Sequence, residues 1–476
     1  MIRFYNSLSR RLEDFKPIND KQVKLYSCGP TVYDFATVGN WRAFIFVDSL
    51  RRYLTNAGYS VKHVMNITDV GHLASDMDEG QDKLEAGAKR EGKSVWQIAS
   101  DYTAAFKLAA ASLNLLPPNG YEGKHDSFAR ATDFIKPQIE IIQQLLKTGY
   151  AYQTDQAIYF DVSRQQDYGK LSGQSLADKQ TAVRSQVVSD PAKRQPQDFA
   201  LWFFVVGRFA KHTMRWDSPW GAGFPGWHLE CSAIIHATLG EPIDIHTGGV
   251  DHIGTHHTNE IAQTEAAYGT PLANYWLHNE FLLVEGAKMA KSLGNFITID
   301  DVKAKGFEPL ALRLFFLQSH YRSQLNFSWT ALQSSQTFLR RLQAWSDLQF
   351  QPQLGHKASA AKSYNAVLSR VNQALSDDLN TPVALASVAK LPELAEADGV
   401  DTAAQKILLD QLEDLFGLDL SQRQDLDSDQ KKLLAKRESA RRSNNFPLAD
   451  ELRQQLAATG VLLNDTPHGA IWSRAG

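Results

Sequence analysis

The stretch Gln22-Val23-Lys24-Leu25-Tyr26-Ser27-Cys28-Gly29-Pro30-Thr31 decides the fold, because an apolar run ends there in a turn. Residues 40–57 then carry apolar side chains at helical spacing, and 60–68 is a second apolar run. Another long helix is predicted over 93–115. This order of strand, helix, strand and helix predicts a parallel, doubly wound sheet, whose ligand crevice lies at the carboxyl ends of the strands. Cys28 and Thr68 fall at those ends.

Length and composition bound the class of protein. A chain of 476 residues is too long for one core and predicts three or four domains. Only two cysteines exclude a disulfide framework and indicate a reducing compartment, so we expect a cytoplasmic protein. The N-terminus has no signal pattern, and no apolar run approaches the ~20 residues of a membrane helix. A net charge of −3 means that any nucleic-acid partner must meet local basic patches.

The pattern changes along the chain. After 116 we expect a helix over 126–148, a hairpin over 152–161 and a polar segment, which together indicate an insertion. The sheet pattern returns at 242–246 and 275–284. Beyond residue 300 the chain is mainly helical, at 309–320, 330–347, 360–375, 381–395, 402–416 and 429–442, and a tail follows with a helix over 447–459 and two short strands.

Cys28 and Cys231 are accompanied by His256 and Glu260, which are one helical turn apart. Two thiolates, an imidazole and a carboxylate are a plausible ligand set for zinc. The alternative is that both cysteines are merely buried, since cysteine is among the most buried residue types. From these residues alone, both interpretations stay open.

Two segments could handle phosphate. Lys288 and Lys291 follow a predicted strand in a glycine-containing loop, and a lysine pair there can clamp a polyphosphate or simply keep the loop soluble. Thr37-Val38-Gly39-Asn40 stands at a predicted helix start, where backbone N–H groups and the helix dipole favour phosphate. Gly39 would let a nucleotide approach the backbone closely.

Several long motifs, in order, closely resemble cysteinyl-tRNA synthetases over nearly the whole chain. They are Tyr26-Ser27-Cys28-Gly29-Pro30-Thr31-Val32-Tyr33-Asp34, Asn66-Ile67-Thr68-Asp69-Val70, Pro225-Gly226-Trp227-His228-Leu229-Glu230-Cys231, Asp244-Ile245-His246-Thr247-Gly248-Gly249, His256-His257-Thr258-Asn259-Glu260, Trp276-Leu277-His278-Asn279 and Leu293-Gly294-Asn295-Phe296. Their number and order are far more specific than any one of them.

The resemblance implies a class I aminoacyl-tRNA synthetase. It would activate L-cysteine with ATP and Mg²⁺ to cysteinyl-adenylate and pass it to tRNA-Cys, with one Zn²⁺ per chain binding the substrate thiolate. The implied α/β fold is a Rossmann-type catalytic domain with an insertion, a helical-bundle anticodon-binding domain and a small C-terminal module. A monomer is the default. The predicted parts are 1–115 and 221–298 (catalytic), 116–220 (insertion), 299–347 (linker helices), 348–418 (helical bundle) and 419–476 (C-terminal module).

The resemblance also implies residue roles. The zinc ligands are Cys28, Cys231, His256 and Glu260, with Glu260 the more loosely held. Cysteine contacts are assigned to Gly29, Thr68, Trp227, His246 and Asp251, although Asp251 could instead cap a turn. ATP contacts are assigned to Gly39, Gly248, Gly249, Lys291 and Ser292, and catalytic roles to Thr37, Asn40, Lys288 and Lys291.

The chain departs from the family at phosphate-handling positions. The first signature, His-x-Gly-His, has Thr37 and Asn40 here, and Ala290 replaces the serine of Lys-Met-Ser-Lys-Ser. Losing one donor to a developing oxyanion typically costs ~10²–10³ in rate. These departures leave open a catalytically weakened tRNA-binding paralogue. A second rival is a cysteine ligase of the mycothiol-biosynthesis type, which resembles the same catalytic core, although the tail argues against it.

Six basic residues between Lys431 and Arg442 belong to a solvated helix face or to a tRNA contact. The resemblance places anticodon recognition in this tail, and Arg441, Arg442 and Trp472 are then candidates for contacting single-stranded bases.

Overall fold

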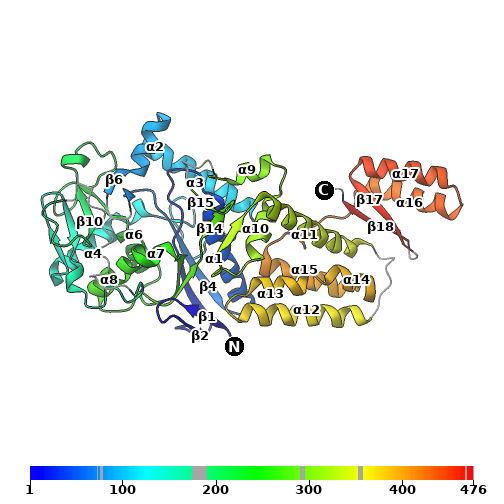
Figure 1. The fold of residues 1–476 in the computed structure, drawn as a ribbon, viewed down its shortest axis with the longest axis horizontal. Coiled ribbons are helices and arrows are strands. Elements are labelled where there is room, and N and C mark those ends of the chain that lie inside the picture. The colour runs from blue at the N-terminus through cyan, green and yellow to red at the C-terminus, as the bar shows by residue number, and fades with distance from the viewer. Residues whose placement is uncertain are drawn as a thin grey trace. The chain divides into compact units, whose positions relative to one another are not determined.

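The computed structural model describes residues 1–71, 73–75, 79–173, 190–289, 295–351, 358–466 and 469–474. The chain forms two compact units (Figure 1): residues 1–301 with 321–326, and residues 302–320 with 327–476. No helix among the described residues is both long and apolar enough to cross a membrane.

The first unit is built on a five-stranded sheet whose paired strands are all parallel, as predicted. Its order is β13 (Ala273–Asn279), β12 (Ile243–Gly249), β3 (Gln22–Ser27), β4 (Ser60–Ile67) and β7 (Ala129–Arg130). From β3 the chain runs to β4 on one side, whereas β12 lies on the other side and continues to β13. The strand order therefore reverses between β3 and β12, and their carboxyl ends flank the crevice that such a reversal creates.

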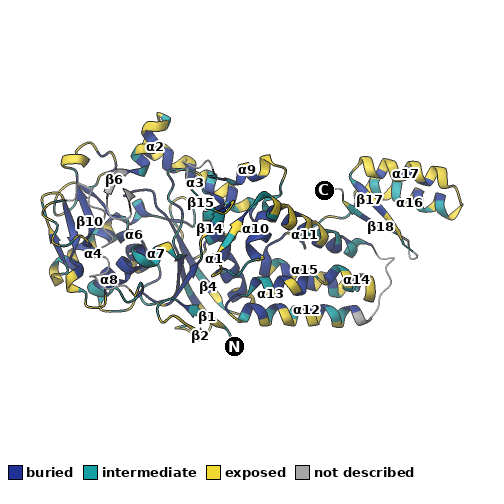
Figure 2. Cartoon of the chain, in the orientation of Figure 1, coloured by how far each residue is buried: buried dark blue, intermediate teal, exposed yellow. Residues whose placement is uncertain are grey.

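Helices connect these strands. The first crossover is α1 (Val38–Asn56), whose buried face carries Trp41, Phe44 and Leu50. It is followed by the hairpin β5 (Leu73–Ser75) and β6 (Glu79–Asp82), and by α2 (Lys83–Glu91) and α3 (Val95–Ser112). The later crossover contains α7 (Asp251–Gly254) and α8 (His256–Tyr268). The strands of the sheet are mostly buried (Figure 2), as expected for a parallel sheet covered on both faces.

The antiparallel part of this unit interrupts the parallel sheet between β7 and β12. It consists of α4 (Ile135–Thr148), β8 (Ala151–Gln153), β9 (Ala157–Phe160), β10 (Phe199–Phe204), β11 (Gly223–Pro225) and α6 (Leu229–Thr238). Two short strands, β1 (Arg3–Asn6) and β2 (Arg11–Asp14), form an N-terminal hairpin. The apolar face of α4 packs with β10 and α6 into one core.

The second unit is mainly helical. The chain enters it within α9 (Ile299–Ala304), and its elements are α10 (Pro309–Leu317), α11 (Trp329–Asp347), α12 (Ala358–Ser376), α13 (Thr381–Val388), α14 (Leu391–Asp398), α15 (Thr402–Phe416), α16 (Ser428–Arg442), α17 (Phe446–Ala458), β17 (Val461–Thr466) and β18 (Gly469–Arg474). The last four elements pack on one another around Leu456, Leu463 and Trp472.

Three predicted elements are wrong in their bounds. The helix predicted over 126–148 begins only at Ile135, because Ala129–Arg130 completes the edge of the parallel sheet. The strand predicted over 275–284 ends at Asn279, and Leu282–Val284 (β14) pairs instead with Ala287–Lys288 (β15). The helix predicted over 381–395 breaks after Val388, and a second one starts with Pro392 in its first turn, where the missing N–H is harmless.

Some basic side chains of helix α16 form ion pairs within the chain. Arg437 is 2% exposed and pairs with Glu438 and Asp465, and Arg441 also pairs with Asp465 on β17. Trp472 is 3% exposed and lies in the core of the module. This packing against apolar side chains disfavours the predicted contact of Trp472 with a single-stranded base.

Candidate active site and metal centre

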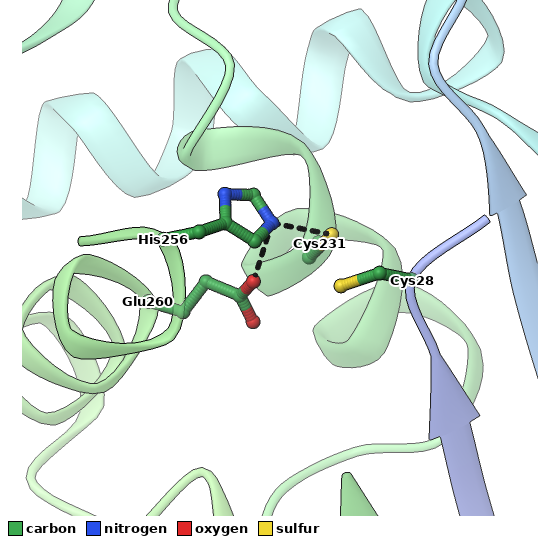
Figure 3. Close-up of side chains that lie close together, drawn as sticks. All are labelled: Cys28, Cys231, His256 and Glu260. Atoms are coloured by element: carbon green, nitrogen blue, oxygen red, sulfur yellow. Dashed lines mark hydrogen bonds and ion pairs between the residues drawn. The ribbon is translucent and has the colours of Figure 1, made fainter. Parts of the chain in front are cut away.

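Four side chains that are far apart in sequence converge at the carboxyl end of β3 (Figure 3). Cys28 follows the last residue of β3, and Cys231 lies in the first turn of α6. His256 begins α8, and Glu260 follows one turn later on the same face. One ligand atom from each of the four lies within 4.8 Å of the others. The structure thus brings together all four predicted metal ligands.

The four donors fit a zinc ion. A tetrahedral site with Zn–S of about 2.3 Å and Zn–N of about 2.05 Å requires a sulfur-to-nitrogen edge of about 3.6 Å. Cys231 Sγ and His256 Nε2 are 3.6 Å apart. His256 Nε2 and Glu260 Oε1 are closer, at 2.8 Å, a direct ion-pair distance that a metal between them would open. Donor chemistry and spacing therefore agree with a Cys₂HisGlu set.

A second set of donors overlaps the first. Cys28 and Glu260 also lie within 4.8 Å of His246 and His257. His246 Nε2 is 2.7 Å from Glu260 Oε2, and Cys28 Sγ is 3.4 Å from His257 Nε2. The distances alone leave two candidate ligand sets that share Cys28 and Glu260.

The pKa shifts of the side chains in this cluster favour the binding of a cation. Burial alone would raise the pKa of Glu260, but His246 and His256 outweigh it and hold that pKa well below its ordinary value. Burial opposes ionisation of His256, yet Glu260 and Cys28 raise its pKa to about 10. Burial also raises the pKa of Cys231, whereas Cys231 and the neighbouring imidazoles lower that of Cys28 despite its burial. Negative charge is thus concentrated on Cys28 and Glu260.

A buried polar network lies beside the metal ligands. The Gly29 backbone N–H donates to Asn66 Oδ1 at 2.7 Å, and Asn66 Nδ2 donates to Thr68 Oγ1 at 3.0 Å. The Thr68 hydroxyl donates in turn to Glu230 Oε2 at 2.8 Å. Glu230 is fully buried and precedes Cys231 in α6. Thr68 thus lines the cavity while its hydroxyl accepts from Asn66 and donates to Glu230.

Aromatic side chains cover the cluster. The Trp227 indole stacks on the His256 ring with centroids 4.2 Å apart and 20° between planes. His246 stacks on Trp276 at 4.6 Å. Asp251 opens α7, and its carboxylate occupies the space in front of Gly249, where an added Cβ would lie 2.2 Å from Oδ1.

The crevice is a cavity of about 670 Å³. Twelve predicted site residues line it: Cys28, Gly29, Thr37, Gly39, Asn40, Thr68, Trp227, Cys231, Gly248, Gly249, Asp251 and His256. His246 and Glu260 are fully buried. Lys291 and Ser292 lie outside the described residues, as does the side chain of Lys288, whose backbone belongs to β15.

Thr37 and Asn40 hold each other at the start of α1. The Thr37 backbone N–H and the Thr37 hydroxyl both donate to Asn40 Oδ1, at 2.9 Å and 2.8 Å. This capping box uses the carbonyl of the Asn40 amide and leaves its N–H groups as donors. Thr37 is 4% exposed, whereas Asn40 is exposed at the cavity. Thr37 thus lines the cavity and also holds the amide of Asn40 through two hydrogen bonds.

Arg42, two residues after Asn40 on α1, connects this helix to the segment before β14. Its guanidinium donates to the Phe281 carbonyl at 2.5 Å and to the carbonyls of Tyr321 and Ser323. Phe281 lies directly before β14, which leads into the lysine segment. Burial lowers the pKa of Arg42 to about 10, so the side chain stays charged at neutral pH.

Sequence reasoning missed the supporting residues. Asn66, Glu230, His257 and His278 stand in motifs that were identified, but nothing in the spacing showed which side chains they face. Arg42 gave no signal at all, because a basic residue on an amphipathic helix predicts a solvent-exposed position.

Family comparisons agree with this geometry. A family model described as tRNA synthetases class I (C) catalytic domain matches residues 14–337. A second, described as Cysteinyl-tRNA ligase anticodon binding domain, matches residues 423–472. The cysteine–tRNA ligase 1 of Burkholderia lata is 43% identical and covers 98% of this chain and 96% of its own length. The cysteine–tRNA ligase of Treponema denticola is 38% identical, with 99% of both chains covered.

Solved structures show the same fold at low identity. Methionyl-tRNA synthetase of Mycobacterium tuberculosis, in complex with methionyl-adenylate, has a TM-score of 0.60 at 15% identity, over 84% of this chain and 93% of its own. The leucyl-tRNA synthetase of Agrobacterium radiobacter, in a ternary complex with tRNA, has a TM-score of 0.60 at 11% identity, over 86% and 85% of the two chains. Since two family models and relatives over nearly the full length agree, this chain belongs to the cysteine–tRNA ligase family of class I aminoacyl-tRNA synthetases.

Proposed function

We propose that this protein ligates L-cysteine to tRNA-Cys in two steps, through a cysteinyl-adenylate made from ATP and Mg²⁺. Membership of the family and the C-terminal domain of the anticodon-binding type support the proposal. The observation that carries it is one cavity of about 670 Å³. Its lining includes members of the predicted metal cluster as well as the capped start of α1. The protein acts as a monomer in the cytoplasm.

Cys28, Cys231, His256 and Glu260 would hold the zinc ion. When bound, zinc would take the substrate thiol as a thiolate, which the harder and far less acidic hydroxyl of serine cannot match. A hydrophobic pocket alone separates such near-isosteres poorly, so an editing domain is not required. His246 Nε2 also lies 2.7 Å from Oε2 of Glu260, and this hydrogen bond fixes the orientation of the carboxylate.

The chain's own residues would orient the rest of the amino acid. Thr68 donates its proton to Glu230 and accepts from Asn66, so the second lone pair of its oxygen would accept from the substrate. An ammonium group needs such an acceptor, and Asp251 adds a carboxylate at the same cavity. Trp227, stacked on His256, would close over the side chain and exclude water.

For ATP, Asn40 would donate to the phosphates while Thr37 holds its amide. At the start of α1 the Val38 N–H already donates to the Ile297 carbonyl at 2.9 Å, so the N–H of Gly39 would be the backbone donor to phosphate, and the Met289 side chain lies beside it. Lys288, Lys291 and Ser292 would complete the phosphate contacts from the segment after β14, and Gly248 and Gly249 would line the adenosine side.

The test is cysteine-dependent exchange of pyrophosphate into ATP with the zinc-loaded chain, followed by charging of a tRNA-Cys transcript. Exchange and charging are the expected results. Exchange without charging would favour the cysteine ligase of the mycothiol type, and absence of exchange would leave the weakened tRNA-binding paralogue. The match of residues 423–472 to the anticodon binding domain supports the synthetase over the ligase.

A further inference from the structure

A row of hydrogen bonds leads from Cys28 away from the crevice. His257 Nε2 lies 3.4 Å from Cys28 Sγ, and His257 Nδ1 lies 2.8 Å from His278 Nε2. His278 Nδ1 is in turn 2.8 Å from Ser7 Oγ. His257 is fully buried, His278 is 3% exposed, and Ser7 follows β1 at the start of the chain. Three separate segments thus meet behind one sulfur.

Register explains how His257 reaches both neighbours. Thr247 on β12 pairs with Ser27 on β3, so Cys28 stands level with Gly248. On the other side, Gly248 pairs with His278 on β13. Adjacent strands are about 4.8 Å apart, so roughly twice that distance separates Cys28 from His278. The ring of His257 fills this gap above Gly248.

Gly248 is what makes the space. A Cβ at this position would lie 2.6 Å from His257 Cε1 and 2.9 Å from His257 Nε2. Any side chain at 248 would therefore displace the nitrogen that faces Cys28. Glycine is therefore required at position 248 so that His257 can approach the strand this closely. This requirement is additional to any approach of a nucleotide.

The row can run in either of two directions, which depend on the tautomers of His257 and His278. In the direction that begins with the Ser7 hydroxyl donating to His278 Nδ1, the proton of His278 is on Nε2. His278 then donates to His257 Nδ1, and the remaining proton of His257 is on Nε2, aimed at Cys28. A metal-bound thiolate is a good acceptor for that N–H group.

We propose that His257, held by His278 and Ser7, is a positioning residue for the Cys28 thiolate, and that it is not itself a metal ligand. The inference rests on the proposed role of Cys28 in the metal site. It decides between the two overlapping donor sets, because a nitrogen that donates its proton to sulfur cannot also bind a metal ion. Outer partners of this kind typically change metal affinity by ~10–100-fold.

The test measures zinc affinity of the full chain by competition with a chromophoric chelator. His257→Phe keeps a ring but removes the donor, and we expect zinc affinity to fall ~10–100-fold. His257→Gln keeps an N–H near the position of Nε2 and should restore most of it. Ser7→Ala removes only the far end of the row and should weaken zinc a few-fold, whereas Ser9→Ala in the same segment should have no effect.

Cobalt-substituted protein gives a second readout. The sulfur-to-cobalt charge-transfer band should shift in His257→Phe and Ser7→Ala, because each changes the hydrogen bonding of the thiolate. Unchanged zinc affinity and an unshifted band in Ser7→Ala and in folded His257→Phe would overturn the proposal. So would His257→Phe abolishing zinc binding while Cys231→Ser leaves it intact, since His257 would then be a ligand. Wild-type protein that takes up no zinc would instead refute the proposed metal site.

Discussion

Thr37→Val tests whether Thr37 acts by orienting Asn40 or by contacting ATP directly. Thr37→Val keeps the shape of a side chain that is 4% exposed and removes its hydroxyl, which donates to Asn40 Oδ1 at 2.8 Å and also caps the backbone N–H of Asn40. The backbone N–H of residue 37 still donates to the same oxygen at 2.9 Å. One neutral hydrogen bond contributes about 1 kcal/mol, so the productive orientation of Asn40 should become about fivefold less favoured.

The assay is ATP–pyrophosphate exchange at saturating cysteine with ATP varied. We expect kcat/KM for ATP to fall three- to tenfold in Thr37→Val, and ~10²–10³-fold in Asn40→Ala, which removes the donor itself. The double variant should be no slower than Asn40→Ala, because Thr37 acts only through Asn40. Thr55→Val, an exposed threonine at the other end of α1, is the matched control.

Two results would refute this reasoning. If the losses of Thr37→Val and Asn40→Ala multiply in the double variant, Thr37 acts on ATP independently. If Thr37→His alone raises the rate, the hydroxyl contact of Thr37 with Asn40 is dispensable. Because Thr37 and Asn40 are hydrogen-bonded to each other, we expect Thr37→His to be a slower enzyme. The two residues then act together, and are not two independent departures from the family signature.

Three further predictions concern the metal centre, the fold and the tail. Cys231→Ser should lower the zinc content of purified protein from one per chain to near zero, measured by elemental analysis, while far-ultraviolet circular dichroism stays unchanged. His63 has its pKa lowered to about 3, first by burial and then by Arg51, so the unfolded state alone gains a proton as pH falls below 6.5. His63 by itself should thus contribute a loss of about 2 kcal/mol of stability between pH 7 and pH 5 in denaturant titrations, and His63→Gln should lose that component. Trp472→Ala should destabilise the C-terminal module by about 3–5 kcal/mol and expose it to proteolysis; a stable module with impaired charging would instead mean that the indole contacts tRNA.

The parallel sheet was predictable because its signals are local. Gln22–Ser27 and Ser60–Ile67 are strands at the predicted places, since apolar runs and helical spacing depend only on neighbours in the chain. Ala129–Arg130 was missed because two residues carry no periodicity, and only pairing with Asn66 and Ile67 makes them a strand. The domain boundaries and the roles of the individual site residues stay predictions.

For the site, the sequence supplied the ligand types and their order, because motifs preserve the spacing of residues on one strand end or one helical turn. His256 and Glu260 are an example, since four residues on a helix face the same way in any context. Residues that act by contact across elements left no comparable signal. Arg42, Glu230 and Ser7 each meet a partner more than 100 residues away, and only the folded chain shows it.

The sequence by itself thus determined the class of fold, the family and the four candidate zinc ligands, because these follow from local spacing and ordered motifs. Tertiary structure decided which imidazoles surround the sulfur of Cys28, and why residue 248 has no side chain. The physical reason is register. Where β12 pairs with β3 and β13, it sets Cys28, Gly248 and His278 side by side, and His257 from α8 fits only in the space that the glycine leaves.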